Sequence, residues 1–183
     1  MKYNPLIHHR RSIRLKVYDY SKAGAYFITI CCEDRIHRFG KVSGDEMILN
    51  QSGTIAYNEW INLAERFPNF ELDVFQIMPN HMHGIIVLSD VTVGATLAVA
   101  QEDDKIKRAT ARVAPTIAEI VGAYKSIVSN ACLQLFKSHN KTMEKLWQRN
   151  YYEHIIRDER AYQNISNYII NNPRNWNEDK FHL

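Results

Sequence analysis

Cysteine is scarce in this sequence, and the few cysteines lack a pattern that would bind a metal or cross-link the chain. Only 3 of the 183 residues are cysteine. Cys31 and Cys32 are adjacent within an apolar segment and Cys132 stands alone. This spacing fits neither a disulfide framework nor a zinc site. We therefore interpret all three as reduced core residues.

Long hydrophobic runs are also missing. No segment approaches the roughly 20 apolar residues that cross a bilayer. Residues 1–5 lack the apolar block of a signal peptide. We therefore expect a cytoplasmic protein with no membrane contact. With 45% hydrophobic and 23% charged residues, the composition fits one compact domain over residues 1–183.

The excess of positive charge is small. A net charge of +3 does not by itself indicate a polyanionic partner. The distribution is more informative, because residues 1–16 contain no acidic residue and carry Lys2, Arg10, Arg11, Arg14 and Lys16. We expect a basic N-terminal arm over residues 1–20, in which Arg10, Arg11 and Arg14 could lie along phosphates. A solvated terminus without a ligand is the alternative.

Periodicity and turn signals predict an alternation of strands and helices. The predicted strands are 25–32, 38–42, 46–49, 72–77, a run that begins at His81, and 146–156. The predicted helices begin at a cap at Ser52 or Thr54, at Thr116, and at Asp158, the last ending near Asn172 before Pro173. Residues 89–114 keep neither period and indicate an inserted loop. This order predicts an α+β fold, a ferredoxin-like antiparallel sheet with helices on one face.

Two histidines begin the apolar run that follows the turn at Pro79 and Asn80. Residues i and i+2 of a strand point to the same face, so His81 and His83 would present their imidazoles side by side. This is the outline of a two-histidine metal site. Paired histidines also occur as ordinary hydrogen-bonded residues, and the strand alone does not decide between the two interpretations.

The last predicted helix carries a tyrosine and an amide on one face. Tyr168 and Asn172 are four residues apart, which brings their Cβ atoms to about 5 to 6 Å. A phenol with a pKa near 10 is a poor nucleophile, and a phosphodiester repels anions, so attack by tyrosine requires a group that polarises the phosphate. A divalent cation held by two imidazoles and an amide oxygen would do this. A half-buried aromatic and a helix-ending asparagine are the structural alternatives.

Two groups of motifs resemble a known enzyme family. The residues 78–83, Met-Pro-Asn-His-Met-His, resemble the histidine signature of the HUH single-strand DNA endonucleases. The residues Trp147-Gln148-Arg149, followed by 151–157, Tyr168-Ile169 and Asn171-Asn172-Pro173, resemble the REP-associated tyrosine transposases, relatives of the single-tyrosine insertion-sequence transposases. The resemblance extends from about residue 25 to residue 176.

The resemblance implies a fold of the HUH endonuclease type and specific roles for four residues. His81 and His83 match the metal-binding histidines, Tyr168 matches the nucleophile, and Asn172 stands where a third, polar ligand is expected. Related insertion-sequence enzymes commonly carry glutamine there. The implied cofactor is magnesium or manganese, and the implied reaction nicks and rejoins single-stranded DNA hairpins through a 5′-phosphotyrosine link. The resemblance leaves open a monomer or a homodimer that exchanges the tyrosine helix.

Other polar and aromatic residues are candidates for DNA contacts. Lys125 could bind phosphates from the polar face of its helix, although a solvated face is the default interpretation. Trp147, Tyr151 and Tyr152 could stack on unpaired bases or pack in the core. Glu153 and His154 have no assigned role.

Two other functions share this fold. A catalytically silent, domesticated module that binds single-stranded nucleic acid would keep the fold and lose the reaction. A replication or mobilisation nickase would use the same chemistry, usually within a larger chain.

Overall fold

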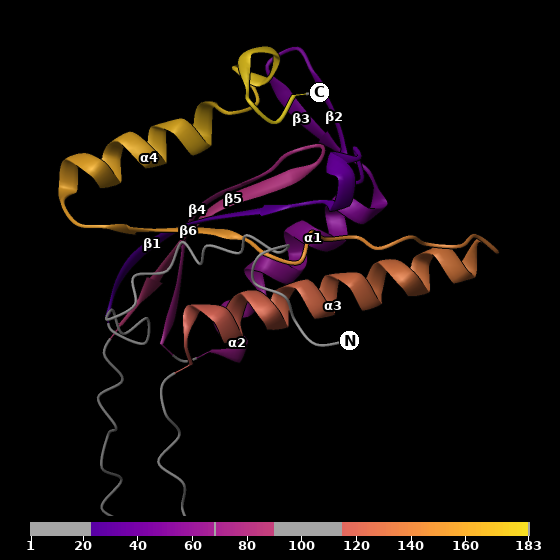
Figure 1. The fold of residues 1–183 in the computed structure, drawn as a ribbon, viewed down its shortest axis with the longest axis horizontal. Coiled ribbons are helices and arrows are strands. Elements are labelled where there is room, and N and C mark those ends of the chain that lie inside the picture. The colour runs from indigo at the N-terminus through magenta and orange to yellow at the C-terminus, as the bar shows by residue number, and fades with distance from the viewer. Residues whose placement is uncertain (1–22, 68, 90–114, 183) are drawn as a thin grey trace, which may run out of the picture.

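The computed structural model of the protein describes residues 23–67, 69–89 and 115–182 (Figure 1). Arg10, Arg11 and Arg14 of the predicted arm lie outside these residues, as does the predicted inserted loop except for Ser89. Within the described residues, no helix is both long and apolar enough to cross a membrane.

A four-stranded antiparallel sheet forms the centre of the fold. Its strands stand in the order β4 (Phe70–Ile77), β5 (His81–Leu88), β1 (Gly24–Cys31) and β6 (Tyr152–Ile156). A separate hairpin consists of β2 (Gly40–Ser43) and β3 (Glu46–Leu49). The helices are α1 (Gln51–Ile61), α2 (Leu63–Arg66), α3 (Ile117–Ser138) and α4 (Glu159–Asn171), with short 3-10 turns at Glu33–Arg35 and Trp176–Glu178. The predicted α+β class is therefore confirmed.

The two faces of the sheet are covered by different helices. Met82, Ile86 and Leu88 of β5 point into a large core that also contains side chains of α1 and α3. The alternate positions, Ile85 and Val87, belong to a smaller cluster on the other face. Figure 1 shows α4 on the side of the sheet opposite to α1 and α3.

The prediction that the helices lie on one face of the sheet was wrong, because α4 covers the face opposite to α1 and α3. Both faces of β1 and β5 are apolar, because Phe27 and Ile85 alternate with Ile28 and Ile86. An apolar second face must also be covered, and the amphipathic α4 covers it through Ile169. As a result, α4 lies on the same face as His81 and His83.

The predicted caps are partly correct. Asp158 caps α4 as predicted, and α3 begins after Thr116 as predicted, where Thr116 forms a capping box with Glu119. The predicted cap of α1, Ser52 or Thr54, was wrong. Asn50 caps the helix, because its Oδ1 accepts a hydrogen bond of 2.9 Å from the Gly53 amide. Ser52 is instead buried as the second residue of the helix.

The predicted strand 146–156 is shorter in the structure. Only Tyr152–Ile156 forms β6, while Trp147 makes a single antiparallel bridge to Cys32. The carbonyl oxygens of Gln148 and Arg149 accept hydrogen bonds from the Lys125 ammonium group instead of from a neighbouring strand. The three cysteines are free, and Cys32 and Cys132 are buried, as predicted.

Candidate active site

His81 and His83 lie side by side at the start of β5. Their Nε2 atoms are 3.0 Å apart, and the two side chains are 0% and 1% exposed. In the sheet, His81 pairs with Cys31 and His83 with Thr29 on β1, which places the imidazoles over the face that α4 covers. Met82 points into the opposite core, so the alternation expected of a strand is present.

Asn80 determines which nitrogen of His81 carries the hydrogen. The Asn80 amide nitrogen donates to the carbonyl oxygens of Arg35 and Phe181 at 3.1 and 2.8 Å. Its Oδ1 therefore faces His81 Nδ1 at 2.8 Å and can only accept. Since Nδ1 then carries the hydrogen, Nε2 of His81 presents a lone pair, which is the arrangement that a metal-binding histidine requires.

Burial keeps both imidazoles neutral. Desolvation lowers the pKa of His81 from 6.5 to about 4. It also lowers the pKa of His83 well below its ordinary value, and the neighbouring His81 charge acts in the same direction. The second nitrogen of His83, Nδ1, lies 2.8 Å from the Thr29 hydroxyl. Two neutral imidazoles held in fixed orientations are suitable metal ligands.

Tyr168 of α4 reaches the histidine pair of its own chain. Its hydroxyl lies 3.2 Å from Nε2 of His83, and the ring centroids of the two residues are 5.1 Å apart. The ring also makes an edge contact with Phe27 on β1. With 39% of its surface exposed, the phenol remains accessible to a large substrate.

Asp179 joins this group, although the sequence did not suggest it. Its Oδ2 accepts hydrogen bonds from the Tyr168 hydroxyl at 3.3 Å and from the Asn172 amide nitrogen at 2.8 Å. Ligand atoms of His81, His83 and Asp179 lie within 4.8 Å of one another, so the three residues could hold a metal ion. Asp179 follows Pro173 in a segment without helical or strand periodicity, so no sequence pattern connected it with Tyr168.

Asn172 also lies in the site, and one of its atoms has no partner. The residue caps α4 and is 1% exposed. Its Oδ1 is buried without a hydrogen bond in the described structure. A buried oxygen without a donor is costly unless a ligand compensates it. Asn172 Oδ1, Asp179 and the two imidazoles thus form a nitrogen and oxygen donor set that fits a divalent cation.

In the absence of a cation, the surroundings of Tyr168 disfavour the phenolate. Partial burial and the negative charge of Asp179 raise the pKa of Tyr168 to about 12. The tyrosine is therefore protonated near neutral pH. A positive charge beside the histidine pair would counteract both effects.

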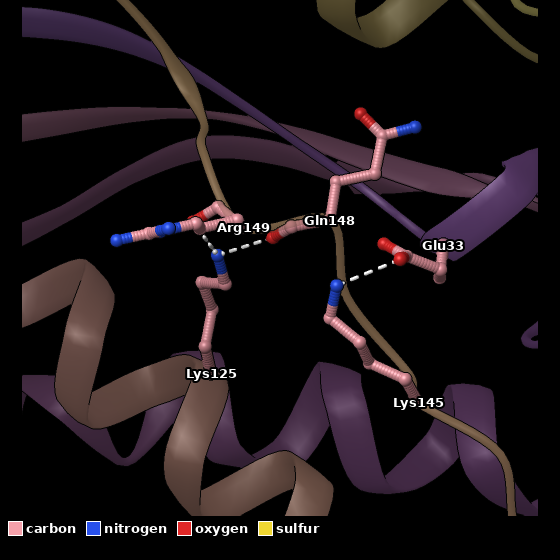
Figure 2. Close-up of polar contacts among 5 residues, drawn as sticks. All are labelled: Glu33, Lys125, Lys145, Gln148 and Arg149. Carbon is pink, nitrogen blue, oxygen red and sulfur yellow. Dashed lines mark hydrogen bonds and ion pairs between the residues drawn. The ribbon is translucent and has the colours of Figure 1, made fainter. Parts of the chain in front are cut away.

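Lys125 lies elsewhere. Figure 2 shows its side chain reaching from α3 to the chain at Gln148 and Arg149, whose carbonyl oxygens accept hydrogen bonds of 2.7 and 3.0 Å from Nζ. Lys145 forms an ion pair of 2.7 Å with Glu33 beside it. These cations line an open pocket of about 310 Å³ together with Ser126, Ser129, Leu146, Trp147, Gln148 and Arg149. Because α3 and α4 cover opposite faces, this pocket is separated from Tyr168 by the sheet.

The aromatic candidates divide between core and surface. Trp147 is 4% exposed and packs against Phe39 and Tyr124, so it belongs to the core. Tyr152 is 47% exposed and lies against Phe27, on the face that carries the histidines. The Tyr151 hydroxyl donates to the buried Glu153 at 2.9 Å.

Comparisons with known proteins agree with these features. No protein-family model matches the chain. An uncharacterized protein of Haemophilus influenzae is 41% identical over 184 residues, which cover 100% of this chain and 98% of that protein. A second protein of that organism, described as a putative REP-associated tyrosine transposase, is 27% identical over 174 residues, covering 90% and 83% of the two chains.

A solved structure of a REP-associated tyrosine transposase bound to a REP hairpin has the same fold. The superposition gives a TM-score of 0.56 at 21% identity and covers 92% of this chain and 77% of the other. The sequence similarity to the named relative includes most of the chain, and the fold agrees with it. The chain is thus similar over most of its length to a putative REP-associated tyrosine transposase, and it has the fold of a solved REP-associated tyrosine transposase.

Proposed function

We propose that this protein is a metal-dependent transposase that nicks and rejoins single-stranded DNA at hairpin sequences through a 5′-phosphotyrosine intermediate. The proposal rests on one observation above all. The hydroxyl of Tyr168 lies 3.2 Å from Nε2 of His83, beside the possible metal ligands His81, His83 and Asp179 and the unpartnered side-chain oxygen of Asn172. We further propose that residues 1–183 act as one transposase domain in the cytoplasm, and that a single chain forms a complete site.

His81 and His83 would hold the cation, with oxygen from Asn172 and Asp179. Magnesium and manganese both accept such mixed ligands, and oxygen ligands suit them best. When bound, the cation would polarise the scissile phosphate and stabilise the phenolate form of Tyr168. The neutral state of both histidines, which follows from their burial, is the state that can donate lone pairs to a cation.

Tyr168 would form the covalent link. Its phenolic oxygen bonds to phosphorus while the bond from phosphorus to the 3′-oxygen breaks, which leaves a 5′-phosphotyrosine. The leaving 3′-oxygen takes up a proton, from Asp179 or water, and becomes a 3′-hydroxyl. Asp179 Oδ2 is positioned to accept the phenolic proton, since it already accepts the Tyr168 hydrogen bond. Rejoining is the reverse reaction, in which the 3′-hydroxyl attacks the phosphotyrosine and the phenol leaves. One phosphodiester bond is exchanged for another, so no nucleotide energy source is consumed.

DNA contacts outside the reaction centre would come from cations and exposed rings. Lys125, Lys145 and Arg149 surround the pocket on the α3 side, where phosphates could replace Glu33 as the partner of Lys145. Arg10, Arg11 and Arg14 would extend these contacts. Tyr152 offers an exposed ring for base stacking beside the histidine face. Hairpin DNA as the ligand is supported by the relative whose structure was determined with a REP hairpin.

A cleavage assay tests this function. The protein is incubated with Mg²⁺ or Mn²⁺ and end-labelled single strands that carry the hairpins flanking its gene, and denaturing gels reveal covalent adducts. We expect an adduct that chelator abolishes and that Tyr168→Phe lowers by a factor on the order of 10³ or more. Tyr152→Phe is the matched control and should retain the adduct. Hairpin binding that survives His81→Ala with Tyr168→Phe, without cleavage by the unmodified protein in either metal, would instead identify a silent binding module.

A further inference from the structure

The attachment of α4 to the sheet depends on few apolar side chains. Within this 13-residue helix, only Ile169 is buried. Ala161, Tyr162 and Ile165 are partly buried against the same small cluster. Tyr168 itself is held by two long hydrogen bonds of 3.2 and 3.3 Å and remains partly exposed. These local contacts leave the helix dependent on other interactions for its rotation and its position along the sheet.

A β-bulge in β4 provides such an interaction. Leu72 pairs with Ile86 and Phe75 pairs with Gly84, so Asp73 and Val74 together stand opposite the single residue Ile85. A bulge of this kind redirects side chains and bends the strand. Here Val74 packs into the cluster beneath α4. Asp73 Oδ1 accepts a hydrogen bond of 2.6 Å from the Val74 amide, which fixes the orientation of its carboxylate.

The second oxygen of that carboxylate binds α4. The Tyr162 hydroxyl donates a hydrogen bond to Asp73 Oδ2, between residues 89 positions apart in the sequence. Tyr162 precedes Tyr168 by six residues, which corresponds to about 9 Å along a helix. A bond between the side chain of a rigid helix and a fixed point on the sheet restricts both the rotation of the helix and its translation. The bond thus acts on Tyr168 through the backbone of α4.

We propose that Asp73 and Tyr162 are a positioning pair that keeps the Tyr168 hydroxyl beside the histidine pair. In the described structure no hydrogen bond joins the pair to His81 or His83, so the pair acts through α4 on Tyr168 and is not itself a proposed metal ligand. This inference rests on the proposed function of Tyr168. A misplacement of about 1 Å costs on the order of 100-fold in rate, so a loosened helix should be detectable in the chemical step.

The experiment compares the unmodified protein with Tyr162→Phe and Asp73→Asn. Gln163→Ala is the matched control, because it removes a 2.8 Å hydrogen bond to Glu159 on the exposed side of the same helix. Three quantities are measured for each protein: hydrogen exchange of the α4 amides, Mn²⁺ affinity, and the single-turnover rate of adduct formation. In both pair variants we expect the α4 amides to exchange faster than in the unmodified protein, while exchange in β5 stays the same. We also expect both variants to form the adduct about 10- to 100-fold more slowly than the unmodified protein. Mn²⁺ affinity should fall by a smaller factor than the rate, because the histidine pair lies on β5 and only part of the proposed ligand set follows α4. Gln163→Ala should match the unmodified protein.

A further variant and an unfolding experiment distinguish a positioning role of the pair from a general loss of structure. Asp73→Ala removes the acceptor completely, whereas Asp73→Asn retains an oxygen, so asparagine should recover part of the rate. Unfolding by denaturant identifies any variant that fails to fold. The proposal is overturned if folded Tyr162→Phe and Asp73→Asn proteins keep the α4 exchange and the adduct rate of the unmodified protein. A lack of adduct with the unmodified protein would contradict the proposed function instead, and the exchange data would still decide whether the pair holds α4.

Discussion

The phenolic oxygen of Tyr168 and Nε2 of His83 lie 3.2 Å apart, although 85 positions separate the two residues in the sequence. The contact exists because β5 and α4 meet on one face of the sheet. Asn172 and Asp179 reach the same point from the end of α4 and the segment that follows it. The proposed nucleophile and the potential metal ligands thus lie together within one chain.

Asn80 should control metal affinity without being a ligand. Asn80→Ala removes the acceptor that keeps the hydrogen of His81 on Nδ1. The hydrogen can then move to Nε2, where it would block the lone pair that binds a cation. Loss of such an outer partner typically weakens metal binding about 10- to 100-fold, and calorimetric titration with Mn²⁺ would measure the change. Asn171→Ala is the control, because the side chain of this exposed asparagine donates only to the Asn167 carbonyl oxygen in the described structure. Equal affinities of the Asn80→Ala and unmodified proteins would contradict the role assigned to Asn80.

Asp179 should contribute strongly to cation binding, although it belongs to none of the sequence motifs. A carboxylate is a better ligand for Mg²⁺ or Mn²⁺ than an amide oxygen, because these hard cations favour charged oxygen. Asp179→Asn should therefore weaken Mn²⁺ binding at least about 10-fold, as measured by electron paramagnetic resonance of the free ion. Glu178→Gln removes a neighbouring exposed carboxylate and should leave the affinity unchanged. Equal losses in the two variants would indicate a general effect of charge.

Local patterns predicted most of the fold. The alternation in β5 separated Met82 from the two histidines, and the cap residues Thr116 and Asp158 marked the starts of α3 and α4. Strand alternation and helix caps depend on residues that are close together in the sequence, so the sequence alone is enough to predict them. The error at α1 arose because Asn50, Ser52 and Thr54 are all favourable caps, and only the chain path selects Asn50.

The contacts between distant segments could not be derived in the same way. Asp179 and the bond between Asp73 and Tyr162 have no periodic signal, and both depend on how α4 and its following segment cross the sheet. Lys125 illustrates a second difficulty. Its position on the polar face of a helix suggested a solvent-exposed cation, whereas the structure uses it to bind two backbone carbonyl oxygens.

The stability of the metal-free protein should fall as the pH decreases from about 6.5 to about 4. Burial lowers the pKa of His81 to about 4 in the folded state, while the unfolded chain protonates near 6.5. Within this window the unfolded state binds more protons, so acid favours unfolding, with a total effect on the order of 3 kcal/mol for His81. His83 shifts in the same direction. Urea unfolding in chelator at several pH values would measure the slope.

The matching variant separates the histidines from the acidic groups that also titrate in this range. The double substitution His81→Asn with His83→Gln removes both imidazoles, so the free energy of unfolding should depend less on pH between 6.5 and 4. An identical slope in both proteins would assign the pH dependence to other groups.

Two glycines test the packing beneath the site. A Cβ at Gly84 in β5 would lie 2.7 Å from Cζ2 of Trp60, a fully buried side chain that packs between Phe75 and Tyr124. Because the ring cannot move without disturbing this core, Gly84→Ala should lower the free energy of unfolding by about 1–3 kcal/mol.

Gly122, on the exposed side of α3, supplies the opposite case. A Cβ at Gly122 meets no atom within 4 Å, so Gly122→Ala should raise the free energy of unfolding by about 0.5–1 kcal/mol through helix propensity. Denaturant unfolding of both variants measures the two effects. If Gly84→Ala were as stable as the unmodified protein, Trp60 would have to be able to shift. The position of β5, and with it that of the histidine pair, would then be less firmly fixed by the core than the packing indicates.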